Sequence, residues 1–158
     1  MPLPPSVTKI NKDGIEFVSS VDRCSYTMKE LCRAALRDVG KFIVITANKQ
    51  AQRLHGLEKN RRVRGIKGSF QYWVRHKYEK YPTLQVGIKH GTWYGTEQEL
   101  GSSKMKKLGI LTNTTQDNID TIVKIESQYL SALENEAEAL ALISESDYPG
   151  EGEDAETE

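Results

Sequence analysis

A long run of apolar residues at helical spacing constrains this chain more than any other feature of its sequence. Between positions 28 and 54 an apolar side chain recurs every three or four residues, as on one face of an α-helix. The face consists of Met28, Leu31, Cys32, Ala35, Leu36, Val39, Phe42, Ile43, Ala47 and Leu54. Thr27 followed by Glu30 has the form of a capping box, so the helix is predicted to begin at Ser25 or Thr27. Gly56 is predicted to end it.

Two shorter segments alternate between apolar and polar residues, as strands do. Residues 69–78 place Phe70 and Tyr72 on one face, which we expect to be core beneath the helices, and residues 83–89 alternate in the same way. Residues 79–82 join them, so a β-hairpin is predicted. A third strand is expected near residues 92–94, and a short first strand at 15–18 follows the Asp13-Gly14 turn.

A second long helix is predicted to begin near Thr114 or Thr115. Its apolar face comprises Ile119, Ile122, Val123, Tyr129, Leu130, Leu133, Ala137 and Leu140. From Glu145 the chain is too polar to bury a core, so we expect residues 145–158 to be a disordered acidic tail. The predicted fold is α+β: an extended N-terminal arm (1–14) and one domain (15–144). In this domain a small antiparallel sheet of three to four strands packs against two long helices on one face.

Charge is distributed unevenly along the 158 residues, although the net charge is zero. Residues 49–107 contain 14 Lys or Arg and 4 Asp or Glu, whereas residues 108–158 contain 1 Lys and 13 Asp or Glu. Such polarity suits electrostatic contacts between subunits or with a ligand, and the alternative is that both regions are simply solvated faces. The apolar fraction of 37 % is low, which indicates either that part of the chain is a tail or arm, or that neighbouring subunits complete the burial of its apolar surface.

Several classes of function are disfavoured. The two cysteines, Cys24 and Cys32, and the three scattered histidines do not have the spacing of a zinc site. Cys32 is expected to be a buried free thiol, and a free thiol fits a protein made in the reducing cytoplasm. No run of about 18 apolar residues predicts a membrane helix, and the N-terminus lacks the pattern of a signal peptide. Glu97 and Glu99 would share a face on a strand, but they are more readily explained as partners of Lys or Arg than as an acid–base pair. We therefore expect no enzyme, cofactor or metal.

Nucleic-acid binding is the alternative that the sequence leaves open. The basic 59–77 region interleaves Arg and Lys with Phe70, Tyr72 and Trp73. Basic side chains beside aromatic rings on a sheet can follow phosphates and stack on bases.

The segment from Tyr94 to Met105 is distinctive. It has the form Tyr-x-x-x-x-Glu-x-Gly-Ser-x-Lys-Met, and Leu108-Gly109-Ile110-Leu111 and a helix follow it. Together with the Gly65–Phe70 segment entering the hairpin, it resembles the gene-10-like tail-component family, the small head–tail joining proteins of long-tailed bacteriophages. Many members of that family carry a proline where this chain has Leu108-Gly109.

The resemblance implies a structural virion protein, made in the host cytoplasm, that completes the tail or joins it to the head. Its expected partners are its own copies in a ring, commonly sixfold, the adjoining neck and tail proteins, and DNA passing through the lumen, with no membrane. The interface residues expected from the resemblance and from the charge pattern are Arg61, Arg62, Arg64, Lys67, Tyr94, Glu97, Glu99, Lys104, Lys106 and Lys107.

Overall fold

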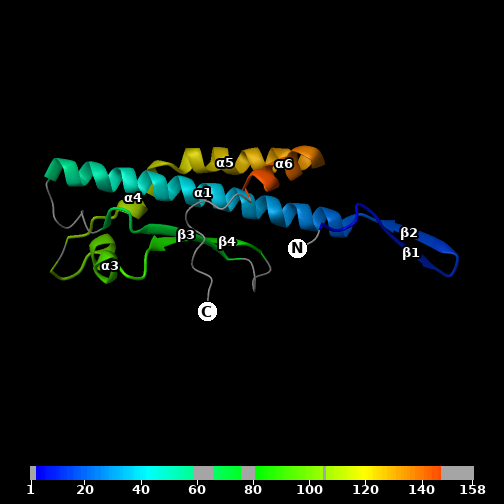
Figure 1. Cartoon of the computed structure of the whole chain (residues 1–158), viewed down its shortest axis with the longest axis horizontal. Coiled ribbons are helices and arrows are strands. Elements are labelled where there is room, and N and C mark those ends of the chain that lie inside the picture. Colours follow the sequence, from blue (N-terminus) through cyan, green and yellow to red (C-terminus); the bar gives the residue numbers. More distant parts are fainter. Residues whose placement is uncertain (1–2, 59–65, 76–80, 105, 147–158) are drawn as a thin grey trace.

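The computed structural model describes residues 3–58, 66–75, 81–104 and 106–146 of the chain. Its fold is α+β, as predicted (Figure 1). The described elements are, in order, β1 (Thr8–Lys12), β2 (Ile15–Ser19), α1 (Val21–Glu58), β3 (Phe70–Arg75), β4 (Thr83–Ile88), α3 (Trp93–Leu100), α4 (Ile110–Asp117), α5 (Ile119–Ser131), the short 3₁₀-helix η1 (Ala132–Glu134) and α6 (Glu136–Ser146).

Helix α1 is 38 residues long and organises the rest of the molecule. It begins at Val21, earlier than predicted. Thr27 does not cap the helix but lies within it, and its hydroxyl donates to the Arg23 carbonyl 3.0 Å away, one turn back. Asp22 in the first turn complements the positive end of the helix dipole. The predicted end at Gly56 is also wrong, since α1 continues to Glu58. A glycine costs a helix only about 1 kcal/mol.

The predicted β3–β4 hairpin is confirmed. Its strands are antiparallel, with Phe70 opposite Ile88, Tyr72 opposite Val86 and Val74 opposite Leu84. Phe70 and Tyr72 are buried, as expected, and the sheet packs on α1. Gly40 permits the close approach, because a Cβ at that position would lie 2.5 Å from Cδ2 of Tyr72. The described residues of this sheet form two strands, fewer than the three or four predicted.

The predicted third strand at residues 92–94 is wrong. After β4 the chain turns, with the Thr92 amide donating to the Lys89 carbonyl at 2.9 Å, and enters helix α3. A Cβ on Gly95 would lie 2.9 Å from Cγ2 of Ile88, so the lack of a side chain lets α3 pack against the end of β4. The Tyr94 region is therefore a helix at the end of β4 and does not extend the sheet.

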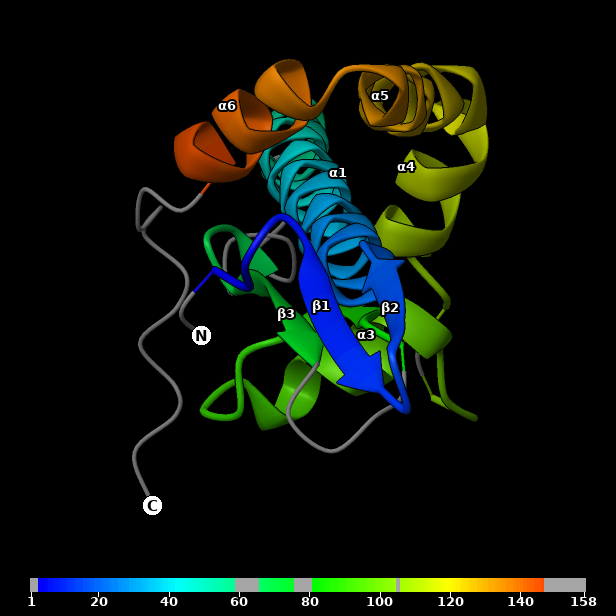
Figure 2. The same cartoon turned by 90° about the vertical axis from the view of Figure 1, so that its right-hand side faces the viewer.

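The sheet does not carry two long helices on one face. Figure 2 shows α1 between the sheet and the α5–α6 layer, and α1 contacts both. One buried cluster joins α1 to α5 and α6 through Leu31, Ala35, Tyr129 and Ile143. The other joins its C-terminal half to β3 and α4 and comprises Ala47, Ala51, Ile66, Phe70 and Ile110.

The predicted second long helix is interrupted into α4, α5, η1 and α6. Asparagines stand at two of the breaks, where their side chains bond to nearby backbone groups: Asn118 Nδ2 donates to the Thr114 carbonyl at 2.8 Å, and Asn135 Oδ1 accepts from the Ala137 amide at 3.1 Å. Such local bonds compete with helix continuation. α6 includes Glu145 and Ser146, and the rest of the predicted disordered tail lies outside the described residues.

The expected N-terminal arm contains a strand. β1 pairs antiparallel with β2, the predicted first strand, through a turn in which Asp13 has φ 55° and Gly14 φ 82°. Positive φ at both central residues is the conformation that Asp-Gly hairpin turns favour. The hairpin extends beyond the first residue of α1 (Figure 1).

Candidate functional site

The segment that carries the family resemblance folds into a closed loop between α3 and α4. Its base is held by the amide of Leu108, which donates to the Gln98 carbonyl at 2.9 Å, and by that of Gly109, which donates to the Glu99 carbonyl at 3.2 Å. At the first residue of the loop, Gly101 adopts φ 84°, a conformation that L side chains rarely adopt. The two ends of the 101–108 loop are therefore fixed by backbone contacts.

Glu99 is the central side chain of this arrangement. Its Oε2 accepts the Ile110 amide at 2.8 Å, and its Oε1 accepts the amides of Leu111 at 2.8 Å and Thr112 at 3.2 Å. These are the orphan N–H groups at the start of α4, where a negative charge is also favoured by the helix dipole. The carboxylate, with its residue only 6 % exposed, thus links α3 to α4.

Gly109 makes this link possible by its backbone conformation. Its φ of 61° and ψ of 34° are left-handed, and it stands immediately before the first residue of α4. Proline, which many of the resembling proteins carry in this region, is fixed near φ −65° and could not replace Gly109 here. The Leu108-Gly109 pair is therefore explained by the way the chain enters α4.

Glu97 and Glu99 do not share a face, as they would on a strand, and the hydrogen bonds of Glu99 are to backbone amides and not to the expected Lys or Arg side chains. Both lie on α3, where two residues correspond to about 200° of rotation, so they point to opposite sides. Glu97 is exposed and Glu99 is buried within the chain. Tyr94 is half-buried on the same helix.

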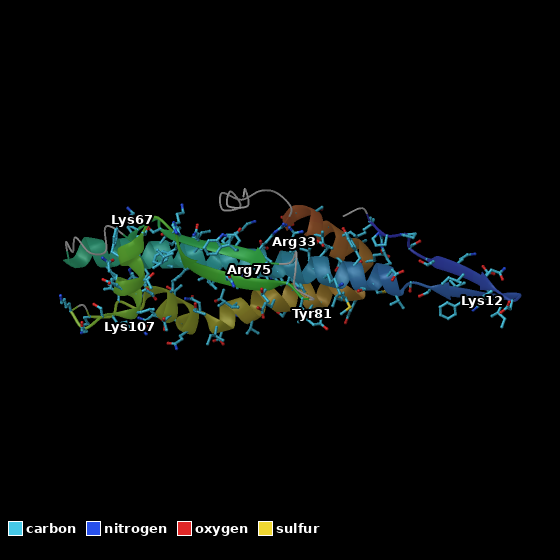
Figure 3. The ribbon with its side chains drawn as sticks, turned by 90° about the horizontal axis from the view of Figure 1, so that it is seen from below. Lys12, Arg33, Lys67, Arg75, Tyr81 and Lys107 are labelled. Atoms are coloured by element: carbon cyan, nitrogen blue, oxygen red, sulfur yellow. The ribbon has the colours of Figure 1, made fainter. Side chains whose placement is uncertain are left out.

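The closed loop presents lysines to solvent. Lys104, Lys106 and Lys107 are exposed, and Lys67 is exposed before β3. Figure 3 places Lys67 and Lys107 at the end of the molecule opposite Lys12 in the N-terminal hairpin. Arg61, Arg62 and Arg64 lie outside the described residues. We call Lys67, Lys104, Lys106 and Lys107 the basic end.

The opposite charge lies on the helices that follow the loop. Exposed carboxylates on α4, α5, η1 and α6 belong to Asp117, Asp120, Glu134, Glu136, Glu138 and Glu145. Glu136 also ties α6 to the start of α1, since Arg23 Nε lies 2.7 Å from its Oε1 while Arg23 Nη1 donates to the Pro4 carbonyl at 2.8 Å. Among the described residues, exposed lysines therefore gather on the loop before α4, and exposed carboxylates lie on the helices after it.

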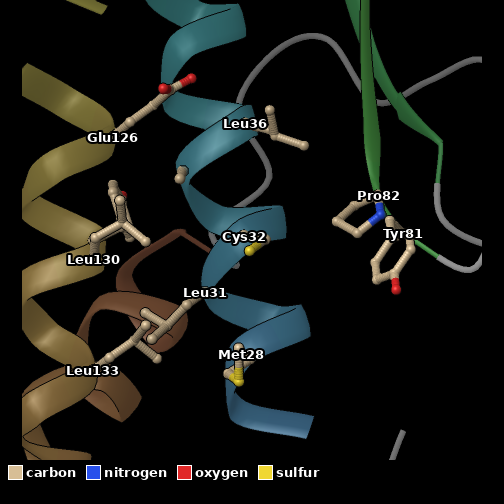
Figure 4. Close-up of a pocket in the computed structure, with 11 residues that line it drawn as sticks. Met28, Leu31, Cys32, Leu36, Tyr81, Pro82, Glu126, Leu130 and Leu133 are labelled. Atoms are coloured by element: carbon tan, nitrogen blue, oxygen red, sulfur yellow. The ribbon is translucent and has the colours of Figure 1, made fainter. Parts of the chain in front are cut away.

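Sequence reasoning missed an apolar groove of about 340 Å³ beside α1 (Figure 4). It lies between α1, the C-terminal part of α5 with η1, and the start of β4, and is lined by Met28, Leu31, Cys32, Ala35, Leu36, Tyr81, Pro82, Glu126, Tyr129, Leu130 and Leu133. Leu130 is 62 % exposed. The prediction that Cys32 is buried is wrong, because its thiol lies in this open groove.

The groove could have been suspected from the pattern of α5. Ile122, Ile125 and Tyr129 lie toward α1, while Ile119, Val123, Leu130 and Leu133 form a second apolar stripe on the adjacent, exposed face. The apolar arc is wider than a single packing face needs.

Tyr129 fixes the floor of the groove. Its hydroxyl donates to the Asp38 carboxylate on α1. Burial, the hydrogen bond to Asp38, and the negative charges of Asp38 and Glu145 raise the pKa of Tyr129 above its usual value. The tyrosine therefore remains a neutral donor at physiological pH, and α5 stays docked to α1 through it.

Within residues 3–58, 66–75, 81–104 and 106–146 there is no group of three or more His, Cys, Asp or Glu placed to hold a metal ion. Among these same residues, no helix has the length and apolar character needed to cross a membrane.

Comparisons with known proteins identify no relative. No protein-family model, curated protein or solved structure matches this chain. The resemblance to phage head–tail joining proteins thus depends on the residues quoted above.

Proposed function

We propose that this chain is a structural protein of a tailed bacteriophage. It forms a ring in the neck or proximal tail of the virion and completes the tail or joins it to the head. The ring has about six copies, as in the proteins that the Tyr94–Met105 segment resembles. Its other partners are the adjoining neck and tail proteins, and DNA passes through its lumen.

The Glu99 link is the observation that carries this proposal. The most distinctive acid of the segment accepts hydrogen bonds from the backbone amides that begin α4, which supports a structural role for this residue. The same link fixes the base of a loop whose lysines all face outward. A rigid base with a charged, exposed tip suits recognition of an acidic protein surface.

The separation of charge supports assembly from identical copies. A basic end and acidic helices on different surfaces can meet between successive subunits. Such head-to-tail contacts close into rings when the rotation between subunits permits.

Removing two tip lysines tests the proposal. We expect a phage carrying Lys106→Gln with Lys107→Gln to accumulate separate heads and tails, seen by electron microscopy, and to lose infectious yield. The matched control is Lys29→Gln with Lys124→Gln, which removes the same charge from exposed positions on α1 and α5 and should assemble normally. Normal virions from a phage that lacks this chain altogether would refute the function.

Nucleic-acid binding through the basic 59–77 region is less well supported. Phe70 and Tyr72 pack beneath α1 with exposures of 3 % and 8 %, so neither ring can stack on a base. Titration of the purified protein with labelled DNA at several salt concentrations separates the two functions. Tight binding that weakens steeply with salt would favour the nucleic-acid alternative.

A further inference from the structure

The N-terminal hairpin has an apolar face that is exposed to solvent among the residues that the structure describes. Directly opposed residues on paired strands share a face, which places Ile10, Phe17 and Ile15 together. Phe17 is 61 % and Ile15 72 % exposed. The other face is more polar: it consists of Val18, Asn11 and the Lys9–Glu16 ion pair at 3.2 Å.

Within the described part of the chain, this hairpin also has little support from other elements. β1 and β2 contact each other, and neither packs substantially on another described element. A two-stranded hairpin by itself is marginally stable in water and needs a further strand, helix or surface against its apolar face. The apolar face of the hairpin is therefore incomplete in a single copy.

The groove beside α1 is the complementary feature. It is an open, almost wholly apolar surface, continuous with the exposed stripe of α5, and Glu126 provides its one carboxylate. The apolar hairpin face likewise includes a single charge, Lys12, opposite Ile15. The two surfaces are thus matched in polarity and in the sign of their charges.

The hairpin cannot reach the groove of its own chain. Ser20 alone connects β2, which ends at Ser19, to α1, which begins at Val21. The hairpin is directed past the end of α1 (Figure 1), whereas the groove begins at Met28 and continues toward the middle of the helix. One residue is too short a connection for the hairpin to fold back.

We infer that the groove binds the β1–β2 hairpin of a second copy of this chain. Phe17 and Ile10 enter the groove among Cys32, Leu130 and Leu133, and Lys12 approaches Glu126. Because each copy has one hairpin and one groove, the contact is heterologous and repeats from copy to copy. The inference rests on the proposed ring function, to which it adds the surfaces that join the subunits.

The native Cys32 in the groove allows a direct test. In a Cys24→Ser background, Phe17→Cys should cross-link to Cys32 of another copy when the purified protein is oxidised with diamide. Non-reducing gels should then show a ladder of covalent multimers. The ladder should disappear when Cys32→Ser is added. The matched control is Asn11→Cys, on the opposite face of the same hairpin, which should give no ladder.

Mixing two defective variants tests the direction of the contact. Ile10→Ser with Phe17→Ser removes the hairpin face, and Leu130→Asp places a charge in the groove at a side chain that is exposed in the single copy. Each variant alone should be monomeric by native mass spectrometry. An equimolar mixture should give a dimer and nothing larger, because only one intact hairpin and one intact groove can meet.

The outcomes separate this inference from the proposed function. Variants that keep the wild-type oligomeric mass, or equal cross-linking from positions 11 and 17, would overturn hairpin insertion and leave the ring function standing. A wild-type protein that stays monomeric and gives no cross-link would also overturn hairpin insertion. The ring function itself is judged by the assembly of phage that lacks the chain.

Discussion

The buried Glu99 carboxylate should be a major source of stability for the α3–α4 region. The variant Glu99→Gln keeps the size of the side chain but removes its charge and replaces one acceptor oxygen with an NH₂ group. One oxygen can still accept from the start of α4, whereas the NH₂ group would face amide donors. Two of the present bonds are made by Oε1, to Leu111 and Thr112, so one orientation of the amide loses both.

The expected cost follows from these contacts. A hydrogen bond to a charged group contributes about 1.5–3 kcal/mol, and loss of a helix cap costs about 0.5–2 kcal/mol. Because the remaining oxygen of the glutamine side chain can still accept a hydrogen bond from α4, part of this stabilisation is retained. We therefore expect Glu99→Gln to lower the free energy of unfolding by about 2–3 kcal/mol. At about 2–4 °C per kcal/mol for a domain of this size, Tm should fall by roughly 5–10 °C.

Urea and thermal unfolding followed by circular dichroism measure this effect. Glu97→Gln is the matched control, since it makes the same chemical change on an exposed side chain two residues earlier. It should unfold like the wild type. If Glu99→Gln also unfolded like the wild type, the reasoning that this carboxylate holds α4 would be refuted.

Three further changes test other contacts. Gly40→Val should lower the free energy of unfolding by about 1–3 kcal/mol through overlap with Tyr72, whereas Gly91→Val, at a glycine with open space around it, should have little effect in the same urea titration. Tyr129→Phe should cost about 1 kcal/mol at neutral pH by removing the hydrogen bond to Asp38. Because folding raises the pKa of Tyr129, its contribution is complete below the unfolded value of about 10 and decreases as pH rises above it, so urea titrations at increasing pH should show the wild type and Tyr129→Phe converging. Arg61→Ser with Arg62→Ser and Arg64→Ser should leave Tm nearly unchanged and block the joining of heads and tails, and normal infectious yield would exclude these arginines from the interface.

Local sequence patterns were sufficient to predict those helices and strands in which apolar residues recur with one regular spacing. The 28–54 stripe predicted a helix through the β-favouring residues around Ile43, and the structure has one. Alternation predicted β3 and β4, with Phe70 and Tyr72 in the core. These predictions succeeded because helical and strand periods are properties of the backbone itself and require no knowledge of the neighbouring elements.

The contacts between segments distant in the sequence were determined only by the tertiary structure. An apolar stripe in the sequence predicts which face of a helix is buried, but it does not predict which element packs on that face. In the structure α1 is packed on two sides, and part of the apolar stripe of α5 is exposed. The role of Glu99 depends on amide groups 11 to 13 residues later, and these become available only because Gly109 enters α4 in a left-handed conformation. The segment with the predicted third strand is instead helix α3, which approaches Ile88 closely through Gly95. Each of these outcomes arises from contacts between segments, which outweigh local preferences of a fraction of a kcal/mol per residue.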